Sequence, residues 1–549
     1  MTDSAGPSAD LRGAGAAPDR VSPTPSPGTR RERLIGFAVV GAIMAATCGE
    51  LIRAGVSVTR VDLGSSWQLI DVPVLEHDPL GSVWYLHTQP PLYNLVIGGL
   101  LRWSPLPPLG SIFGLYLAAL CGAAFLFTDV LAKWRVRPWI AGLIAGVVLA
   151  DPNLLATINI ASYEVPVTFL LMLVLWCFQR YLQRPGWGPL LGLSGALTAL
   201  VMMRSLFHPA FALVVVGVAV VARRASWRQV TAGLAIPIVL AGGWMLKNEV
   251  LFGTPTMSSW LGFNVQRGVV ATLPRTEVQR AVADGDVTEL ALEYPWLALD
   301  EYPTAAGCLP AHRHRAVSAA QKRRVGLYPY PNLNDECFLP LYAESQSNAV
   351  ALVRRDPVGY LGTRRQVLLS SFTVGEIGSG SSGRVMGTGK RAPERTWMDE
   401  TVGRAMLPVH VDLDIAGWNL PIVEVDSIEI QVSPLLALLA LGIAVRAGLA
   451  CIRTARRGWR RRAATWDTDE LLWILTGGYL VAIIVVGDLL EFGENGRFRT
   501  PLDALLLGLP LAGLARTWTA RREQRRQNAT SASDPSAGPA DASARGERR

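Results

Sequence analysis

A short polar stretch, YLHTQPPLYN at residues 85–94, directly precedes the apolar run LVIGGLL. In it, His87, Gln89 and Asn94 flank the pair Pro90–Pro91, and proline favours the first position of a helix. A helix that begins at this pair would present Tyr93 and Asn94 near the membrane interface. Such a boundary suits a polar ligand, whereas an aromatic anchor in the membrane interface with satisfied polar groups has the same composition.

The residues before this stretch offer several carboxylates, namely Asp62, Asp71, Glu76 and Asp78. A carboxylate held at a membrane surface can act as a general base that removes a proton from a hydroxyl group. Aspartates in loops also cap short helices, which is the structural alternative for each of these acids. We expect that one acid of this segment is catalytic.

Two arginine-containing turns offer binding sites for an anion. Arg204 and His208 lie in MMRSLFHPAF, between two apolar runs, and their spacing of four residues could place them on one helix face. A guanidinium fork beside a second donor suits a phosphate group, although snorkelling toward lipid headgroups would also explain the arginine. The turn GENGRFR contains Glu494, Arg497 and Arg499 between the last two apolar runs.

A tyrosine and a glutamate, Tyr163 and Glu164, open another apolar run after NIAS. A glutamate at the start of a helix can simply cap it. Acids at or near a membrane are nevertheless functional candidates by default, and this pair could complete a site with the acidic segment.

The composition places the chain among polytopic membrane proteins and excludes a soluble enzyme. Half of its 549 residues are hydrophobic and only 17% are charged. About ten apolar runs approach the length that crosses a bilayer. They lie near residues 34–54, 110–132, 138–158, 162–182, 187–203, 206–222, 229–247, 432–452, 470–488 and 501–516. The net charge of +8 does not indicate nucleic-acid binding, because the basic residues form clusters between these runs.

The positions of the basic clusters predict the topology. If all are cytoplasmic, the apolar runs alternate without conflict, provided that residues 91–103 form an interfacial or re-entrant helix rather than a span. Residues 55–109 and 249–431 then lie outside, together with the candidate residues above and Lys247. The predicted parts are a disordered cytoplasmic N-terminus (1–29), a transmembrane module (30–248), an extracytoplasmic loop (249–431), C-terminal transmembrane helices (432–518) and a disordered cytoplasmic tail (519–549).

Cysteines and metal motifs add one further expectation. Cys308 and Cys337 are the two cysteines of the large outer loop, and an oxidising compartment would allow them to pair. Two free or buried thiols are the alternative. No HExxH motif and no CxxC pair occurs, so the sequence specifies no metal site.

The order of these features resembles the C-type (GT-C) membrane glycosyltransferases that use polyprenyl-phosphate sugars, in particular protein O-mannosyltransferases and aminoarabinose lipid A transferases. The likeness covers about residues 34–270 and 430–516 and is carried by HTQPPLYN, KNEVLFGTPTMSSWLGFN and GENGRFRTP. It implies an all-α polytopic fold with about ten transmembrane helices, an interfacial helix and a large extracytoplasmic loop. It also implies an enzyme in the plasma membrane of a bacterium, the source that the Ala, Arg and Gly bias favours.

The resemblance further implies an inverting sugar transfer to an extracytoplasmic acceptor, which can be a cell-envelope glycan, a glycolipid or a protein. By its position before the Pro-Pro pair, Asp62 matches the catalytic Asp of the family. The second acid that often follows directly is replaced by Leu63, so Asp71 stays a candidate base. The family uses basic side chains, sometimes with a divalent metal, to hold the lipid phosphate; the candidates are Arg204, His208, Lys247, Arg497 and Arg499.

Two other classes of function stay open. A transporter or flippase for a lipid-linked or polar solute would place ionisable residues on broken helices within the membrane, where Asp129 and Asp151 are the residues to examine. A non-catalytic scaffold for envelope assembly would only bind a lipid phosphate.

Overall fold

A computed structural model describes residues 30–532, except 271, 294, 306, 324–329, 374–408, 421–422, 461–465 and 493–494. The expected N-terminal tail, the last residues of the chain and the candidate Glu494 therefore lie outside the described residues. The described part is predominantly helical, as predicted, and many of its helices begin at a proline, which is pre-organised for the first helical position.

Seven helices of the described part are long and apolar enough to cross a membrane, or eight if one bent pair counts as a span. They are α1 (Arg30–Arg53), α6 (Pro108–Lys133), α9 (Glu164–Gln183), α12 with η1 and α13 (Trp227–Pro237, Ile238–Gly242, Gly243–Phe252), α20 (Pro434–Arg460), α21 with η6 and α22 (Thr468–Leu480, Val481–Val485, Val486–Leu490), and α23 with η7 and α24 (Asn495–Arg499, Thr500–Leu502, Asp503–Ala532). The bent pair is α7 (Pro138–Leu149) and α8 (Pro152–Asn159).

The count of about ten spans stays a prediction, because it needs two shorter apolar helices as well. These are α10 (Trp187–Met203) and α11 (Pro209–Ala222), of 17 and 14 residues. Each predicted apolar run nevertheless coincides with a helix or with the bent pair.

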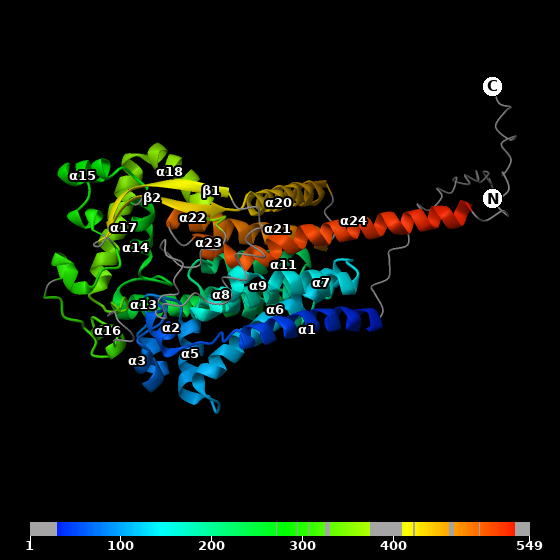
Figure 1. Ribbon diagram of the computed structural model, residues 1–549, viewed down its shortest axis with the longest axis horizontal. Coiled ribbons are helices and arrows are strands. Elements are labelled where there is room, and N and C mark those ends of the chain that lie inside the picture. Colours follow the sequence, from blue (N-terminus) through cyan, green and yellow to red (C-terminus); the bar gives the residue numbers. More distant parts are fainter. Residues whose placement is uncertain are drawn as a thin grey trace, which may run out of the picture.

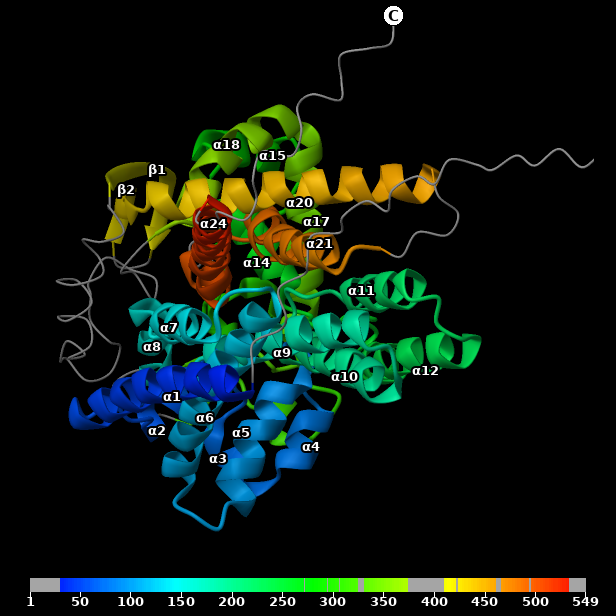
Figure 2. The ribbon, with the colours of Figure 1, turned by 90° about the vertical axis from the view of Figure 1, so that its right-hand side faces the viewer.

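Figure 1 shows α1, α6, α7, α9 and α24 running along the long axis, with the start of α1 and the end of α24 toward the same end. In Figure 2, α20 crosses α24 instead of running beside it.

Residues 55–109, called the first loop below, fold into short helices and one longer helix. These are α2 (Arg60–Ser65), α3 (Val72–His77), α4 (Pro79–Trp84) and α5 (Pro91–Trp103). Helix α5 begins at the second residue of the Pro-Pro pair and spans 13 residues, which is too short to cross a bilayer upright. The helix predicted at 91–103 is therefore present.

Residues 249–431 are called the large loop below, and their described parts gather beyond the ends of the long helices (Figure 1). Their elements are α14 (Leu261–Val270), α15 (Arg275–Ala283), η2 (Glu289–Leu292), η3 (Leu299–Glu301), η4 (Pro303–Ala305), α16 (Arg315–Ser318), α17 (Phe338–Arg355), α18 (Pro357–Ser370), β1 (Val409–Leu420) and, ending just past the loop, β2 (Val423–Val432). An aromatic core that includes Trp260, Phe263 and Tyr342 joins α14 to α17.

Two expectations about these segments need correction. The fold is not purely helical, because β1 and β2 form an antiparallel pair in which Val409 faces Val432. The C-terminal tail is not disordered from residue 519, because α24 continues to Ala532. Its sequence from 520, ARREQRRQN, is rich in Arg, Gln, Ala and Glu, which favour a helix even without an apolar face.

Helices α1 and α7 approach each other closely at small residues. A Cβ atom added to Gly142 would lie 2.2 Å from the carbonyl oxygen of Gly36, and one added to Gly36 would lie 2.4 Å from that of Pro138. Small residues let transmembrane helices pack backbone against backbone, where dispersion replaces the hydrophobic effect as the source of attraction. These glycines therefore fix the distance between the two helices.

Candidate functional site

The large loop holds the first loop in place through buried polar groups. The side chain of Asn334 accepts a hydrogen bond from the backbone N–H of His87 at 2.9 Å and donates one to the carbonyl of Tyr85 at 3.1 Å. The backbone N–H of Ser259 donates to the carbonyl of His87 at 3.0 Å, and the Ser258 hydroxyl donates to that of Thr88. The geometry of YLHTQPPLYN thus depends on residues far along the chain.

The side chains of His87, Gln89 and Asn94 are all buried, so the polar cluster of YLHTQPPLYN is not exposed to water. His87 Nδ1 lies 2.7 Å from the Ser259 hydroxyl, and Nε2 lies 3.1 Å from the carbonyl of Asn334. Burial, reinforced by the positive charge of Lys247, lowers the pKa of His87 to about 3. A histidine with both nitrogens satisfied holds the loop together, and its lowered pKa keeps it uncharged near neutral pH.

Asn94 has a similar structural role. Its amide donates to the carbonyl of Gln68 at 2.8 Å and accepts from the N–H of Ile70 at 2.9 Å. These bonds anchor the backbone directly before Asp71 to the first turn of α5. Lys247 also binds backbone, since its ammonium donates to the carbonyl of Leu86 at 2.6 Å.

The candidate base Asp62 is buried at the start of α2. Its Oδ2 accepts hydrogen bonds from the backbone N–H of Thr59 at 2.8 Å and from the Thr59 hydroxyl at 2.6 Å, which forms a capping box. Its Oδ1 accepts no hydrogen bond from a described residue. Burial raises the pKa of Asp62, and the bonds from Thr59 oppose this shift. Capping and catalysis are therefore compatible here, because each uses a different oxygen.

The rival base Asp71 is tied to the large loop. Its Oδ1 accepts from the N–H of Arg323 at 3.2 Å, and the neighbouring Lys322 ammonium donates to the carbonyls of Ser66 and Leu69 at 2.8 and 2.7 Å. Burial raises the pKa of Asp71, while the Arg323 N–H and the charges of Lys322, Arg323 and Arg315 act against this rise. The buried Lys322, whose pKa burial lowers to about 8, was not foreseen from the sequence.

Four predicted site residues from three distant segments form one cluster. Glu164, the first residue of α9, receives Arg497 from α23, with Nε 3.0 Å from Oε1. Arg204, the residue directly after α10, approaches the same oxygen with Nη1 at 4.0 Å. The guanidinium of Arg204 lies 5.0 Å from the ring centroid of Tyr163 and 4.6 Å from that of Phe498. We call these residues the Glu164 cluster.

The Glu164 cluster is buried and incompletely hydrogen-bonded. Arg204 is 2% exposed and Glu164 is 0% exposed. Neither terminal nitrogen of Arg204 and neither carboxylate oxygen of Glu164 makes a hydrogen bond with a described residue. Ion pairing and two aromatic faces hold Arg204 in place, yet its N–H groups keep their hydrogen-bonding capacity. A buried donor without an acceptor is costly, which makes this cluster a candidate binding site.

The other predicted cations lie in different surroundings. His208 does not share a helix with Arg204, because α10 ends at Met203 and α11 starts after His208. The ring of His208 accepts a hydrogen bond from the N–H of Ala210 at 3.2 Å. Arg499 is satisfied within the protein. It pairs with Asp503 at 2.8 and 3.1 Å and donates to the carbonyls of Ser371 and Thr373.

A second acidic residue lies near the Arg499–Asp503 ion pair, at the bend between α7 and α8. Asp151 is buried, and its carboxyl group interacts electrostatically with that of Asp503. Its Oδ1 also accepts from the N–H of Asn153 at 3.1 Å. The sequence had marked Asp151 as a residue to examine, whereas nothing in the sequence pairs it with Asp503.

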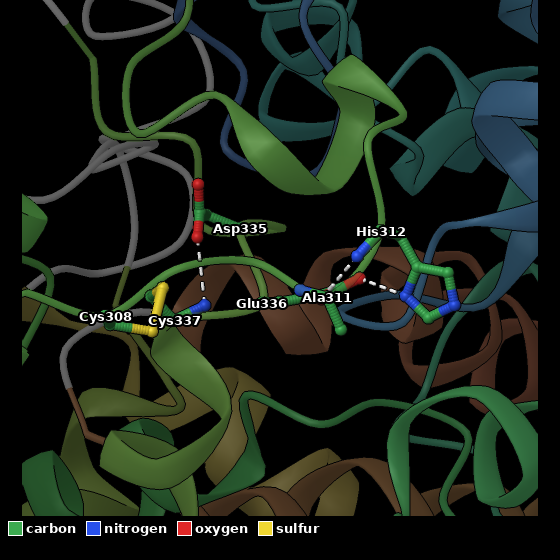
Figure 3. Close-up of a disulfide and its surroundings, with 6 residues drawn as sticks. All are labelled: Cys308, Ala311, His312, Asp335, Glu336 and Cys337. Atoms are coloured by element: carbon green, nitrogen blue, oxygen red, sulfur yellow. Dashed lines mark hydrogen bonds and ion pairs between the residues drawn. A yellow bond between two sulfur atoms is a disulfide. The ribbon is translucent and has the colours of Figure 1, made fainter.

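The expected disulfide is present, since Cys308 and Cys337 are bonded (Figure 3).

The described residues contain no group of three or more His, Cys, Asp or Glu side chains that could hold a metal ion. The described residues therefore offer no preformed site of this kind for a divalent metal. Comparisons of the chain with known protein families, curated proteins and solved structures gave no significant match.

Proposed function

We propose that this membrane-embedded protein is a glycosyltransferase that moves a sugar from a polyprenyl-phosphate donor to an extracytoplasmic acceptor. The observation that carries the proposal is Arg204. Its guanidinium is buried, oriented by Tyr163 and Phe498, and leaves both terminal nitrogens without a hydrogen bond to the described residues. A phosphate oxygen is the acceptor that best matches a guanidinium fork.

The position of Arg204 suits the chemistry of the leaving group. When the bond between the sugar and the phosphate breaks, negative charge develops on the phosphate. A cation that is already fixed in a site of low dielectric stabilises that charge without reorganising, and so lowers the barrier. Glu164 keeps Arg204 and Arg497 close together, and the lipid tail of the donor can stay in the bilayer beside the apolar helices.

The acceptor hydroxyl needs a base, for which we propose Asp62, with Asp71 as the alternative. Burial raises the pKa of both carboxyl groups and makes each a stronger base once it is ionised. Asp62 retains one oxygen that accepts no hydrogen bond from a described residue. In this proposal the proton of the acceptor hydroxyl passes to the carboxylate, the hydroxyl oxygen bonds to the anomeric carbon, and polyprenyl phosphate leaves.

The test is transfer of a radiolabelled sugar from a panel of polyprenyl-phosphate sugars by membranes that contain the wild type, Asp62→Asn, Asp71→Asn or Arg204→Lys. We expect transfer by the wild type, loss in Asp62→Asn and a strong reduction in Arg204→Lys. Loss in Asp71→Asn alone would move the base to Asp71. The proposal fails if no donor supports transfer while the wild type binds polyprenyl phosphate.

A second candidate function, transport of a lipid-linked or polar solute, is favoured by one observation. The bend of 55° between α7 and α8 places a buried acid, Asp151, beside Asp503. Ionisable groups at interrupted helices are typical of transporter binding sites. Flux of a polyprenyl-phosphate sugar across proteoliposomes that stops in Asp151→Asn, without any sugar transfer, would favour this function.

A further inference from the structure

Tyr93, in the first turn of α5, is a buried residue to which the proposed function gives no role. Its hydroxyl donates a hydrogen bond to the backbone carbonyl of Ala161 and lies 2.9 Å from the hydroxyl of Tyr116. A phenol has one hydrogen to donate, so the Tyr116 hydroxyl is the donor to Tyr93. A buried hydroxyl needs a partner, and Tyr116 alone could provide one. The hydrogen bond to Ala161 therefore needs a separate explanation.

Ala161 has an unusual backbone conformation in the turn between α8 and α9. Its φ angle is 47°, in the left-handed region that residues with a Cβ atom rarely adopt. The N–H of Ala161 donates to the carbonyl of Ile158 at 3.1 Å, and the N–H of the next residue, Ser162, donates to that of Thr157 at 3.1 Å. A left-handed residue persists only where surrounding contacts fix it. The hydrogen bond from Tyr93 to the Ala161 carbonyl is such a contact.

This turn presents the residues that orient Arg204. Tyr163 and Glu164 follow Ala161 directly after one intervening residue. The Arg204 guanidinium lies 5.0 Å from the ring centroid of Tyr163 and pairs with Glu164. Tyr93 also contacts Tyr163 itself, since their rings meet edge to face with centroids 5.7 Å apart. Tyr93 thus contacts the short segment on which the orientation of Arg204 depends at two points.

The residue after Tyr93 holds the other half of the proposed site. Asn94 binds the backbone directly before the candidate base Asp71, as described above. Two consecutive residues in the first turn of α5 therefore join the first loop to the Glu164 cluster. The packing of α5 fixes the position of the candidate bases relative to Arg204.

We propose that Tyr93 is a positioning residue that holds Ala161 in its left-handed conformation and thereby sets the affinity of Arg204 for the phosphate group of the lipid donor. This inference rests on the proposed function. A guanidinium binds phosphate through directed hydrogen bonds, so its orientation decides how well they form. Without the bond from Tyr93, Ala161 can relax to a right-handed or extended conformation. Tyr163 and Glu164 would then shift, and Arg204 would lose its orientation.

The experiment measures binding of radiolabelled farnesyl phosphate to the full-length protein in neutral detergent, with farnesol as the comparison ligand. Tyr93→Phe keeps the ring contact with Tyr163 and removes only the hydroxyl. The matched control, Tyr116→Phe, removes the other hydroxyl of the pair and leaves the bond from Tyr93 to Ala161. We expect Tyr93→Phe to weaken farnesyl phosphate binding at least about fivefold and the control less than about twofold. Binding of farnesol, which has no phosphate, should not change in either variant.

A rescue variant tests whether the effect passes through the turn. Glycine adopts a positive φ without steric cost, so Tyr93→Phe/Ala161→Gly should bind farnesyl phosphate within about twofold of the wild type. A loss of packing around Tyr93 would not be repaired by removing a further methyl group. Amide hydrogen exchange without ligand should also be faster at Ala161 and Ser162 in Tyr93→Phe than in Tyr116→Phe.

Several results would overturn the inference. Unchanged farnesyl phosphate binding in Tyr93→Phe, equal weakening in Tyr116→Phe, or no recovery in the double variant would each contradict the positioning role. A parallel loss of farnesol binding would show general disruption of the site instead. The expected binding results in a protein that transfers no sugar from any donor would remove the glycosyltransferase role and keep Tyr93 as a positioning residue. A wild type that binds farnesyl phosphate no better than farnesol would overturn both proposals.

Discussion

At the scale of single residues, Arg204 and Arg499 differ in how their hydrogen bonds are used. The guanidinium group of Arg499 donates hydrogen bonds to Asp503 and to two backbone carbonyls, so it stabilises the fold. The guanidinium group of Arg204 makes an ion pair and two aromatic contacts, but its terminal nitrogens make no hydrogen bond to a described residue. The same side chain is thus a structural group in one place and a candidate ligand-binding group in the other.

Substituting each arginine by lysine should separate these two roles. Arg499→Lys loses several buried hydrogen bonds, and we expect the free energy of unfolding to fall by about 1–3 kcal/mol. Arg204→Lys should cost less than about 1 kcal/mol, because only aromatic contacts weaken, yet binding of polyprenyl phosphate should fall by at least about tenfold. Thermal unfolding in detergent and lipid-phosphate binding are the two measurements. Similar losses of stability in both variants would contradict this assignment.

The raised pKa of Asp62 predicts a specific pH dependence. The base is active only when ionised, so sugar transfer should decrease as pH falls through the pKa of Asp62. Because burial raises that pKa, the decrease should start above the pH of about 4 at which an exposed aspartate becomes protonated. The measurement is kcat/KM for transfer between pH 4 and 8. An acidic limb at the position of an ordinary aspartate would argue against Asp62 as the base.

The sequence predicted several residues of the site but not their roles. Tyr163, Glu164, Arg204 and Arg497 were each found from a polar residue at the end of an apolar run, and the structure brings them together. Arg497 and Arg499, only two residues apart, could not be told apart. Whether a buried arginine meets Glu164 or Asp503 depends on tertiary packing, which has no local pattern in the sequence.

At the scale of elements, the close contact of α1 and α7 allows a direct test. Gly142→Ala would place a methyl group 2.2 Å from the carbonyl oxygen of Gly36, and we expect a loss of about 1–3 kcal/mol in stability. In the control, Gly114→Ala in α6, the added methyl group meets no atom within 4 Å. That change should be neutral or stabilise by up to about 1 kcal/mol, since alanine favours a helix. Equal unfolding temperatures for both variants in detergent would show that the helices can move apart.

Elements with a strong periodic pattern were predictable, and those with a competing pattern were not. The helix α5 followed from the Pro-Pro pair, and the long helices followed from their apolar runs. The strand β2 has clear period-two alternation in VEVDSIEIQV, a signal that could have identified the hairpin. The end of α24 was missed because its charged sequence lacks apolar residues, whereas helix propensity alone extends it from the preceding span.

At the scale of the whole molecule, the predicted topology can be tested by labelling. In a chain that keeps the disulfide but has serine at Cys48, Cys121, Cys177 and Cys451, a new cysteine would report its side of the membrane. We expect a membrane-impermeant maleimide to label Arg280→Cys on α15 in intact cells, and Arg521→Cys near the end of α24 only after lysis. Labelling of Arg521→Cys in intact cells would show that the topology is the reverse of the predicted one. The proposed acceptor would then not lie on the side of the large loop.

The bonds between Asn334 and the first loop also have a consequence for biosynthesis. The backbone of His87 finds its hydrogen-bond partner 247 residues later in the chain. At a synthesis rate of about 5–20 residues per second, residues 85–90 wait on the order of tens of seconds after they emerge before Asn334 exists. Throughout that interval the helices on either side can already be inserted in the bilayer, while the backbone of His87 and Thr88 lacks its bonds to Asn334. The arrangement of residues 85–88 seen in the folded protein can therefore form only after Asn334 has been synthesised.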